Sequence, residues 1–228
     1  MGEVVEFPSN GSPAGGYLAS GEGAGPGVVV IHEWSGLVPH IRDVCDRLAA
    51  EGFTALAPDL LDGRPIADED DEDEKARTAL GPGAVARDLS GAVDFLAGHR
   101  AVRGHGVGVV GFGMGGGLAL WLASLRPGDV RAVVPFYGAM PWAESQPDWD
   151  RVKAPVEGHY GEEDGWATPE SARSLERELE SRGTEVRLFL YPGAGHGFFD
   201  DSRPEAYAED AARQAWVRTL EFLRAKLG

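Results

Sequence analysis

The sequence has few cysteines, few basic residues and no long apolar run, and each shortage excludes a class of protein. Cys45 is the only cysteine among 228 residues, which excludes an internal disulfide and a zinc site built from cysteines. Lys and Arg number 21 against 37 Asp and Glu, and a net charge of −16 argues against nucleic acid or an anionic membrane surface as a partner. No stretch approaches the roughly 18 apolar residues of a membrane-spanning helix, and no signal peptide is visible. We therefore expect a cytoplasmic protein that acts on a small molecule, as a monomer or a homodimer.

Apolar runs alternate with amphipathic segments along the chain. The runs that predict buried strands cover residues 27–31, 53–57, 106–110, 131–136, 156–160 and 185–191, and helical spacing covers 40–51, 83–100, 115–125, 169–182 and 204–227. Apolar strands that alternate with helices predict an α/β fold with a mostly parallel sheet and helices on both of its faces. No linker divides the chain, so we expect a single domain over residues 1–228. The acidic segment 67–75, "ADEDDEDEK", is expected to be a solvated loop or an exposed helix start.

The segment "VVGFGMGGGLAL", residues 109–120, predicts a strand, a glycine-rich turn and a helix of small residues. One large class of hydrolases places its nucleophile on such a turn, in the pattern Gly-x-Ser-x-Gly or Gly-x-Cys-x-Gly. Here the central residue is Gly113. Asp164 and His196 follow later strands, and the order of turn, acid and histidine is that of the α/β-hydrolase fold. An Asp–His pair fixes the tautomer of the imidazole, which a general base requires.

Six blocks of the sequence, in order, resemble the dienelactone hydrolase family from about residue 27 to the C-terminus. The blocks are "VVVIHEWSGL", "RLAAEGFTALAPDLLDG", "VGVVGFGMGG", "VVPFYGAMP", "GHYGEEDGWATPE" and "YPGAGHGFFDD". The resemblance implies an α/β-hydrolase fold and no cofactor. It also implies hydrolysis of lactones and related esters by a cysteine on the turn, a histidine, an aspartate and a glutamate.

Matched to that family motif by motif, Glu33 takes the place of the glutamate, Asp164 of the aspartate and His196 of the histidine. The place of the cysteine falls on Gly113. The resemblance further implies that the backbone amides of Trp34 and Met114 form the oxyanion hole.

The sequence also differs from the family at a position that contacts the substrate. Members with anionic substrates carry an arginine four residues after the histidine, where this chain has Asp200, and Arg203 lies nearby but out of register. This weakens the case for a dienelactone carboxylate as the substrate. We expect Tyr137, Trp166 and Arg203 to contribute to substrate binding.

Two other residues could replace the missing nucleophile, and neither is favoured. Cys45 lies on the apolar stripe of a predicted helix, and a buried thiol has a raised pKa and is inert. Ser35 lacks the strained turn that exposes a hydrolase nucleophile. No two histidines have the spacing of metal ligands, so we expect no metal site.

A glycine at the centre of the turn leaves three functions open. His196, alone or with Glu33, could activate a water molecule that hydrolyses a lactone or ester directly. The His196–Asp164 pair could instead transfer protons without hydrolysis, as in a lyase, an isomerase or a cyclase. The chain could also be an inactive relative that only binds. The sequence alone does not exclude an engineered replacement at Gly113.

Overall fold

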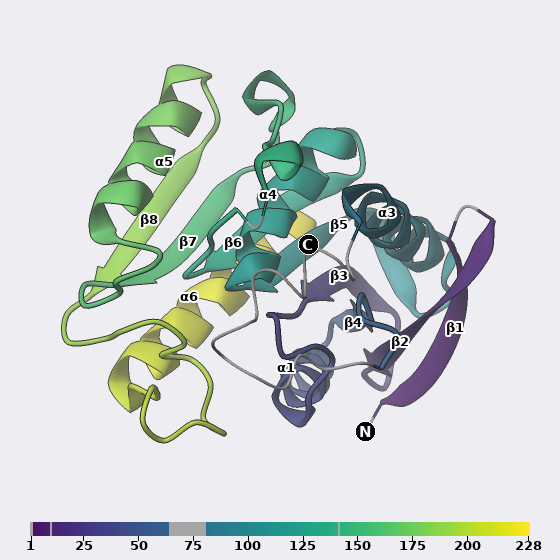
Figure 1. Cartoon of the computed structure of the whole chain (residues 1–228). Helices are drawn as coiled ribbons and strands as arrows, with labels where there is room; N and C mark the ends of the chain where they lie inside the picture. The colour runs from purple at the N-terminus through teal and green to yellow at the C-terminus, as the bar shows by residue number, and fades with distance from the viewer. Residues whose placement is uncertain (1, 10, 64–80, 141) are drawn as a thin grey trace.

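Eight strands form one sheet in the computed structural model, which describes residues 2–9, 11–63, 81–140 and 142–228 (Figure 1). The order across the sheet is β1-β2-β4-β3-β5-β6-β7-β8. The acidic segment 67–75 lies outside the described residues. The strands are β1 (Glu3–Ser9), β2 (Ser12–Ser20), β3 (Gly25–Ile31), β4 (Thr54–Pro58), β5 (Val102–Phe112), β6 (Val130–Phe136), β7 (Val156–Gly161) and β8 (Val186–Tyr191).

The strands from β3 to β8 run parallel to one another, which confirms the predicted mostly parallel sheet. Their middle members are buried on both faces, and this burial is why they appear in the sequence as continuous apolar runs. The antiparallel hairpin of β1 and β2 is an addition to the predicted strands. β1 forms one edge of the sheet, and its partly exposed residues, with Pro8 among them, lack the apolar run that reveals a central strand.

Helices cover both faces of the sheet, as predicted (Figure 1). Helices α1 (Pro39–Ala50) and α6 (Glu209–Leu227) pack on one face, and α3 (Pro82–Gly98), α4 (Met114–Leu125) and α5 (Pro169–Ser181) pack on the other. Two short 3-10 helices, η2 (Ala143–Ser145) and η3 (Trp149–Arg151), follow β6. No helix among the described residues is long and apolar enough to cross a bilayer.

The last helix begins at Glu209, later than the predicted start near residue 204. The preceding segment is instead attached to the loop that carries His196, because the amide of Ala208 donates a hydrogen bond to the carbonyl of Phe198. This attachment keeps residues 200–207 beside the carboxyl ends of the strands, where α/β folds place their ligand sites.

Candidate active site

The turn between β5 and α4 holds Gly113 in a conformation that side chains rarely adopt, with φ of 52° and ψ of −118°. Its amide donates a hydrogen bond to the carbonyl of Phe136 on the neighbouring strand, which fixes the turn to the sheet. A Cβ atom built on Gly113 would lie 3.6 Å from His196 Nε2 and 3.7 Å from Glu33 Oε2, and nothing is closer. These are ordinary contacts, so there is room for a small group between the imidazole and the carboxylate.

His196 and Asp164 form a hydrogen-bonded pair beside this turn. Nδ1 of His196 donates to Oδ2 of Asp164 at 2.9 Å, and Oδ1 of Asp164 accepts from the amides of Trp166 and Ala167 at 2.8 and 2.9 Å. Burial alone would raise the pKa of Asp164, but these hydrogen bonds and the imidazole outweigh it and lower the pKa below the ordinary value. The ionised carboxylate keeps the proton on Nδ1, so Nε2 presents its lone pair toward Gly113.

Glu33 follows β3 and is held from two sides. Its Oε1 accepts a hydrogen bond from the hydroxyl of Tyr137 at 3.4 Å, and its Oε2 lies 3.5 Å from Nη2 of Arg203. Burial and the negative charge of Glu33 raise the pKa of Tyr137 well above its ordinary value, so this hydroxyl remains a donor. Tyr137 is fully buried and has a positive φ of 39°, which is unusual for a side chain of this size.

Arg203 contacts the site, although it does not occupy the sequence position of the family's arginine. Its Nε donates to Oδ2 of Asp200 at 3.0 Å, so the guanidinium lies between two carboxylates. Burial opposes the charge on Arg203, but Glu33 and Asp200 outweigh it and raise the pKa of the guanidinium. The position depends on Gly197, which has φ of 75° and lacks the Cβ atom that would collide with the guanidinium.

Two aromatic rings flank the imidazole of His196, those of Tyr137 at 4.9 Å and Trp166 at 5.4 Å between centroids. Trp166 is 52% exposed and lines a cavity of about 580 Å³. The sequence did not single out Trp149 and Tyr160, which line the same cavity. The buried hydroxyl of Tyr160 has no hydrogen-bond partner among the described residues and is a candidate contact for a substrate.

The two amides predicted for the oxyanion hole are free to donate. Met114 is the first residue of α4, where an amide has no partner inside the helix. Neither the amide of Met114 nor that of Trp34 donates a hydrogen bond to another described residue. The indole of Trp34 is buried and packs edge-on against Trp142. The assignment of an oxyanion hole remains a prediction.

The other candidates lie apart from the turn. Cys45 is fully buried in α1, and burial raises the pKa of its thiol far above the ordinary value, as expected of an inert thiol. Within the described ranges, His40, Asp200 and Asp201 are the group whose side chains could together hold a metal ion. Both oxygens of Asp200 already accept hydrogen bonds from Ser202 and Arg203, so we assign no metal there.

A profile of the dienelactone hydrolase family matches residues 14–227. The chain belongs to this family. It is 34% identical to protein usf of Aquifex pyrophilus over 230 residues, which cover 98% of each chain. It is 33% identical over 233 residues to a protein of Aquifex aeolicus named "Putative carboxymethylenebutenolidase", with both chains covered completely.

Among solved structures, the "Putative Dienelactone Hydrolase" of Klebsiella pneumoniae superimposes with a TM-score of 0.88 at 27% identity, covering 98% of both chains. Together with the parallel sheet, this similarity confirms the α/β-hydrolase fold. The chain is therefore a member of a family of hydrolases, whose relatives include proteins named "Putative carboxymethylenebutenolidase" and "Probable 2-oxo-3-(5-oxofuran-2-ylidene)propanoate lactonase".

Proposed function

We propose that this protein hydrolyses a lactone or a carboxylic ester by direct attack of water, with Gly113 at the position of the family nucleophile. One observation carries the proposal. The space at the Cβ position of Gly113 adjoins both Nε2 of His196 and Oε2 of Glu33. A group bound there would have a base on one side and a carboxylate on the other.

The proposed reaction needs no covalent intermediate. Nε2 of His196 takes a proton from water as the water oxygen bonds to the carbonyl carbon of the substrate, and Asp164 stabilises the imidazolium. The amides of Trp34 and Met114 hold the oxyanion of the tetrahedral intermediate. When the carbon–oxygen bond of the leaving group breaks, the imidazolium returns its proton to the alkoxide. An ester then yields a carboxylate, an alcohol and a proton, and a lactone yields a hydroxycarboxylate and a proton.

The charges around Arg203 favour a neutral substrate. Its guanidinium is offset by Glu33 at 3.5 Å and Asp200 at 3.0 Å, so an anionic substrate would have to displace a carboxylate to bind it. We propose that Arg203 and Tyr137 act mainly by holding Glu33, and that Trp166 contacts the substrate. The apolar walls of the neighbouring cavity suit an ester or lactone with an apolar part.

The test is hydrolysis of neutral lactones and activated esters by the purified protein, with His196→Ala and Gly113→Cys as variants. We expect turnover by the wild type, loss of nearly all of it in His196→Ala, and one solvent oxygen in the carboxylate when the reaction runs in ¹⁸O-labelled water. Mass spectrometry should detect an acyl adduct on Gly113→Cys and none on the wild type.

Each other outcome rejects the proposal in a recognisable way. An acyl adduct on the wild type would reveal another nucleophile. A product formed without solvent oxygen, with activity still dependent on His196, would identify proton-transfer chemistry instead. An inactive wild type with an active Gly113→Cys would identify a relative that has kept the pocket and lost the chemistry.

A further inference from the structure

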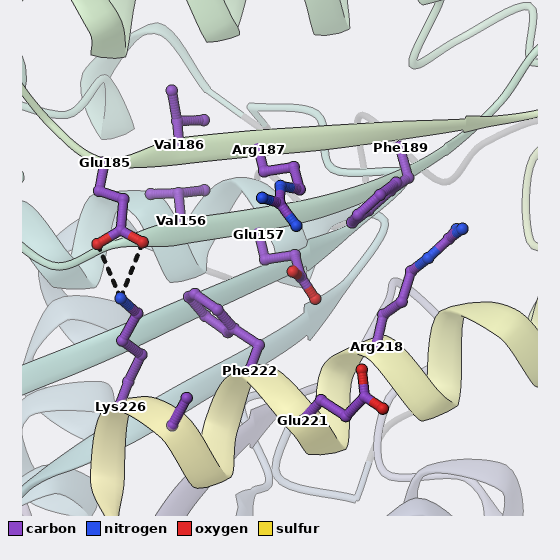
Figure 2. A pocket seen from close by; sticks show the side chains of 11 residues that line it. Val156, Glu157, Glu185, Val186, Arg187, Phe189, Arg218, Glu221, Phe222 and Lys226 are labelled. Atoms are coloured by element: carbon purple, nitrogen blue, oxygen red, sulfur yellow. Dashed lines mark hydrogen bonds and ion pairs between the residues drawn. The ribbon is translucent and has the colours of Figure 1, made fainter.

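A second cavity, of about 490 Å³, lies between α6 and the strands β7 and β8 at one edge of the sheet (Figure 2). It is lined by Glu157 on β7, by Arg187 and Phe189 on β8, and by Arg218 and Phe222 on α6. Val156 and Glu185 place it toward the amino ends of these strands, whereas the candidate active site lies at the carboxyl ends. None of the predicted site residues lines it.

Glu157 is a buried carboxyl group that points into this cavity (Figure 2). Its side chain is 9% exposed, and its Oε1 has no hydrogen-bond partner among the described residues. Burial raises the pKa of Glu157 to about 7, although Arg187 and Arg218 oppose the rise. A buried polar atom without a partner is costly, so this atom needs an explanation.

The neighbouring histidine does not supply the missing partner. Nη1 of Arg218 donates to the hydroxyl oxygen of Tyr191 at 2.9 Å, and that hydroxyl pairs with Nδ1 of His159 at 3.0 Å. Nε2 of His159 pairs with Thr219 at 3.1 Å, while Oε1 of Glu157 is 3.9 Å away. Burial lowers the pKa of His159 to about 3, and Arg218 adds to the effect, so this imidazole is neutral.

Two arginines of the cavity also lack an acidic partner. No carboxylate of the described chain lies within 4.0 Å of Arg187 or Arg218, whereas Lys226 at the edge is paired with Glu185 at 2.8 Å. The guanidinium carbons of Arg187 and Arg218 lie 5.9 and 4.0 Å from the ring centroid of Phe189. Two guanidinium groups without a carboxylate partner in the described chain therefore lie near Phe189, whose ring also stacks on the imidazole of His159 at 5.7 Å. Phe222 lines the same cavity from α6 (Figure 2).

We propose that this cavity binds a small aromatic carboxylate, with its carboxylate on Arg187 and Arg218 and its ring against Phe222. Guanidinium groups bind carboxylates in a planar, two-point geometry, and aromatic rings stack on one another and on arginine. Glu157 lies at the base of the cavity, where its protonated carboxyl can donate a hydrogen bond to the ligand. The Glu185–Lys226 pair is neutral, which leaves the two arginines against Glu157 and the exposed Glu221.

The probe is 4-fluorobenzoate, titrated into the intact protein and followed by ¹⁹F NMR and calorimetry. We expect saturable binding at millimolar or lower concentrations, weakened at least about tenfold by Arg187→Glu. Arg213→Ala is the matched control, because Arg213 lies on α6 outside the cavity and pairs with Asp210. Binding should persist in Arg203→Ala, which separates this cavity from the active site. Benzylamine and benzyl alcohol should not compete.

The pH dependence of binding is an independent test. Raising the pH through about 7 ionises Glu157 beside the ligand carboxylate, so affinity should fall, and Glu157→Gln should remove most of that fall. The other charged or titratable groups around Glu157 are Arg187 and Glu185 at β8, Arg218, Glu221 and Lys226 on α6, and His159 on β7, whose pKa burial lowers to about 3. Absence of saturation, binding that Arg187→Glu leaves unchanged, or preference for benzylamine would each overturn the proposal.

Discussion

Two groups of side chains combine the same four residue types, Glu, His, Tyr and Arg, in different states. At the carboxyl ends of the strands, Glu33, His196, Tyr137 and Arg203 surround the turn at Gly113, and every member has a hydrogen-bond or charged partner. Glu157 and Arg218 line the second cavity, and Arg218 is connected through Tyr191 to His159. In this group Oε1 of Glu157 has no hydrogen-bond partner among the described residues.

The difference lies in the hydrogen-bond partners of each histidine. His196 has the ionised Asp164 on Nδ1, so a proton taken up on Nε2 is stabilised. His159 has only hydroxyl partners, and burial holds its pKa near 3. An imidazole is therefore suited to proton transfer beside Gly113 and to packing behind the second cavity. The presence of a carboxylate partner, more than the residue type, distinguishes the two histidines.

The largest expected effect on activity comes from replacing each of the two histidines in turn. His196→Gln should lower kcat/KM for a lactone or ester by about 10³-fold, because it removes the proposed general base. His159→Gln should leave kcat/KM within about threefold but lower the free energy of unfolding by about 1–3 kcal/mol, since Tyr191 and Thr219 lose a buried partner. Steady-state kinetics and urea unfolding measure the two effects. Equal losses of activity would break the comparison.

Removal of the charge behind His196 should have a somewhat smaller effect. Asp164→Asn should lower kcat by about 10²–10³-fold, because the imidazolium loses its stabilising carboxylate. The lowered pKa of Asp164 also stabilises the fold above pH 3.8, and this contribution is lost as the pH falls through the depressed value. Urea unfolding of both proteins should therefore give a difference in stability that shrinks in acid. A constant difference at every pH would contradict the assignment.

Filling the space at Gly113 should lower activity by about 10²-fold. Gly113→Ala places a methyl group beside His196 Nε2, where the proposal puts the attacking water, and adds strain at a positive φ. Gly183→Ala is the matched control, because Gly183 has φ of 73° and open space around its Cβ position. Rates and melting temperatures of both variants separate strain from loss of the water site. Unchanged kinetics in Gly113→Ala would exclude a water at this position.

The smallest expected effect concerns Glu157, the carboxyl group of the second cavity. The pKa of Glu157 is raised from 4.5 to about 7, so the native state holds this proton more tightly than the unfolded chain. Stability contributed by the protonated group is present below pH 4.5 and is lost as the pH rises through 7. Glu157→Gln should therefore raise the free energy of unfolding at pH 8 by about 1–2 kcal/mol and leave it nearly unchanged at pH 4. Urea titrations at both pH values test this, and a loss of stability at pH 8 would be the contrary result.

The sequence predicted the parts of this molecule that local pattern controls. The central parallel strands are buried on both faces, so their apolar runs were sufficient. The β1–β2 hairpin is an edge structure with polar and exposed positions such as Val4, which is 72% exposed, and it lacks that signal. The order of Gly113, Asp164 and His196 along the chain predicted which side chains would meet.

Other contacts depend on packing that no local pattern reveals. Arg203 reaches Glu33 because Gly197 leaves room for its guanidinium, and its place in the sequence alone suggested only that it lies nearby. The second cavity requires Glu157 to lie opposite Arg187 in the β7–β8 register and α6 to lie above them. The lack of a partner at Glu157 is a property of three elements together, so no motif could have predicted it.

Trp166 lies beside His196 with its ring tilted by 41°, and this contact gives the site a fluorescent side chain next to the proposed base. Trp166 is 52% exposed, whereas Trp34, Trp121 and Trp142 are each less than 10% exposed. A protonated imidazole quenches the fluorescence of an indole that it contacts, and the two rings lie 5.4 Å apart. The emission of Trp166 should therefore follow the charge on His196 without any substrate, and Trp166→Phe should abolish that signal. The state of the proposed base can be read even before its substrate is known.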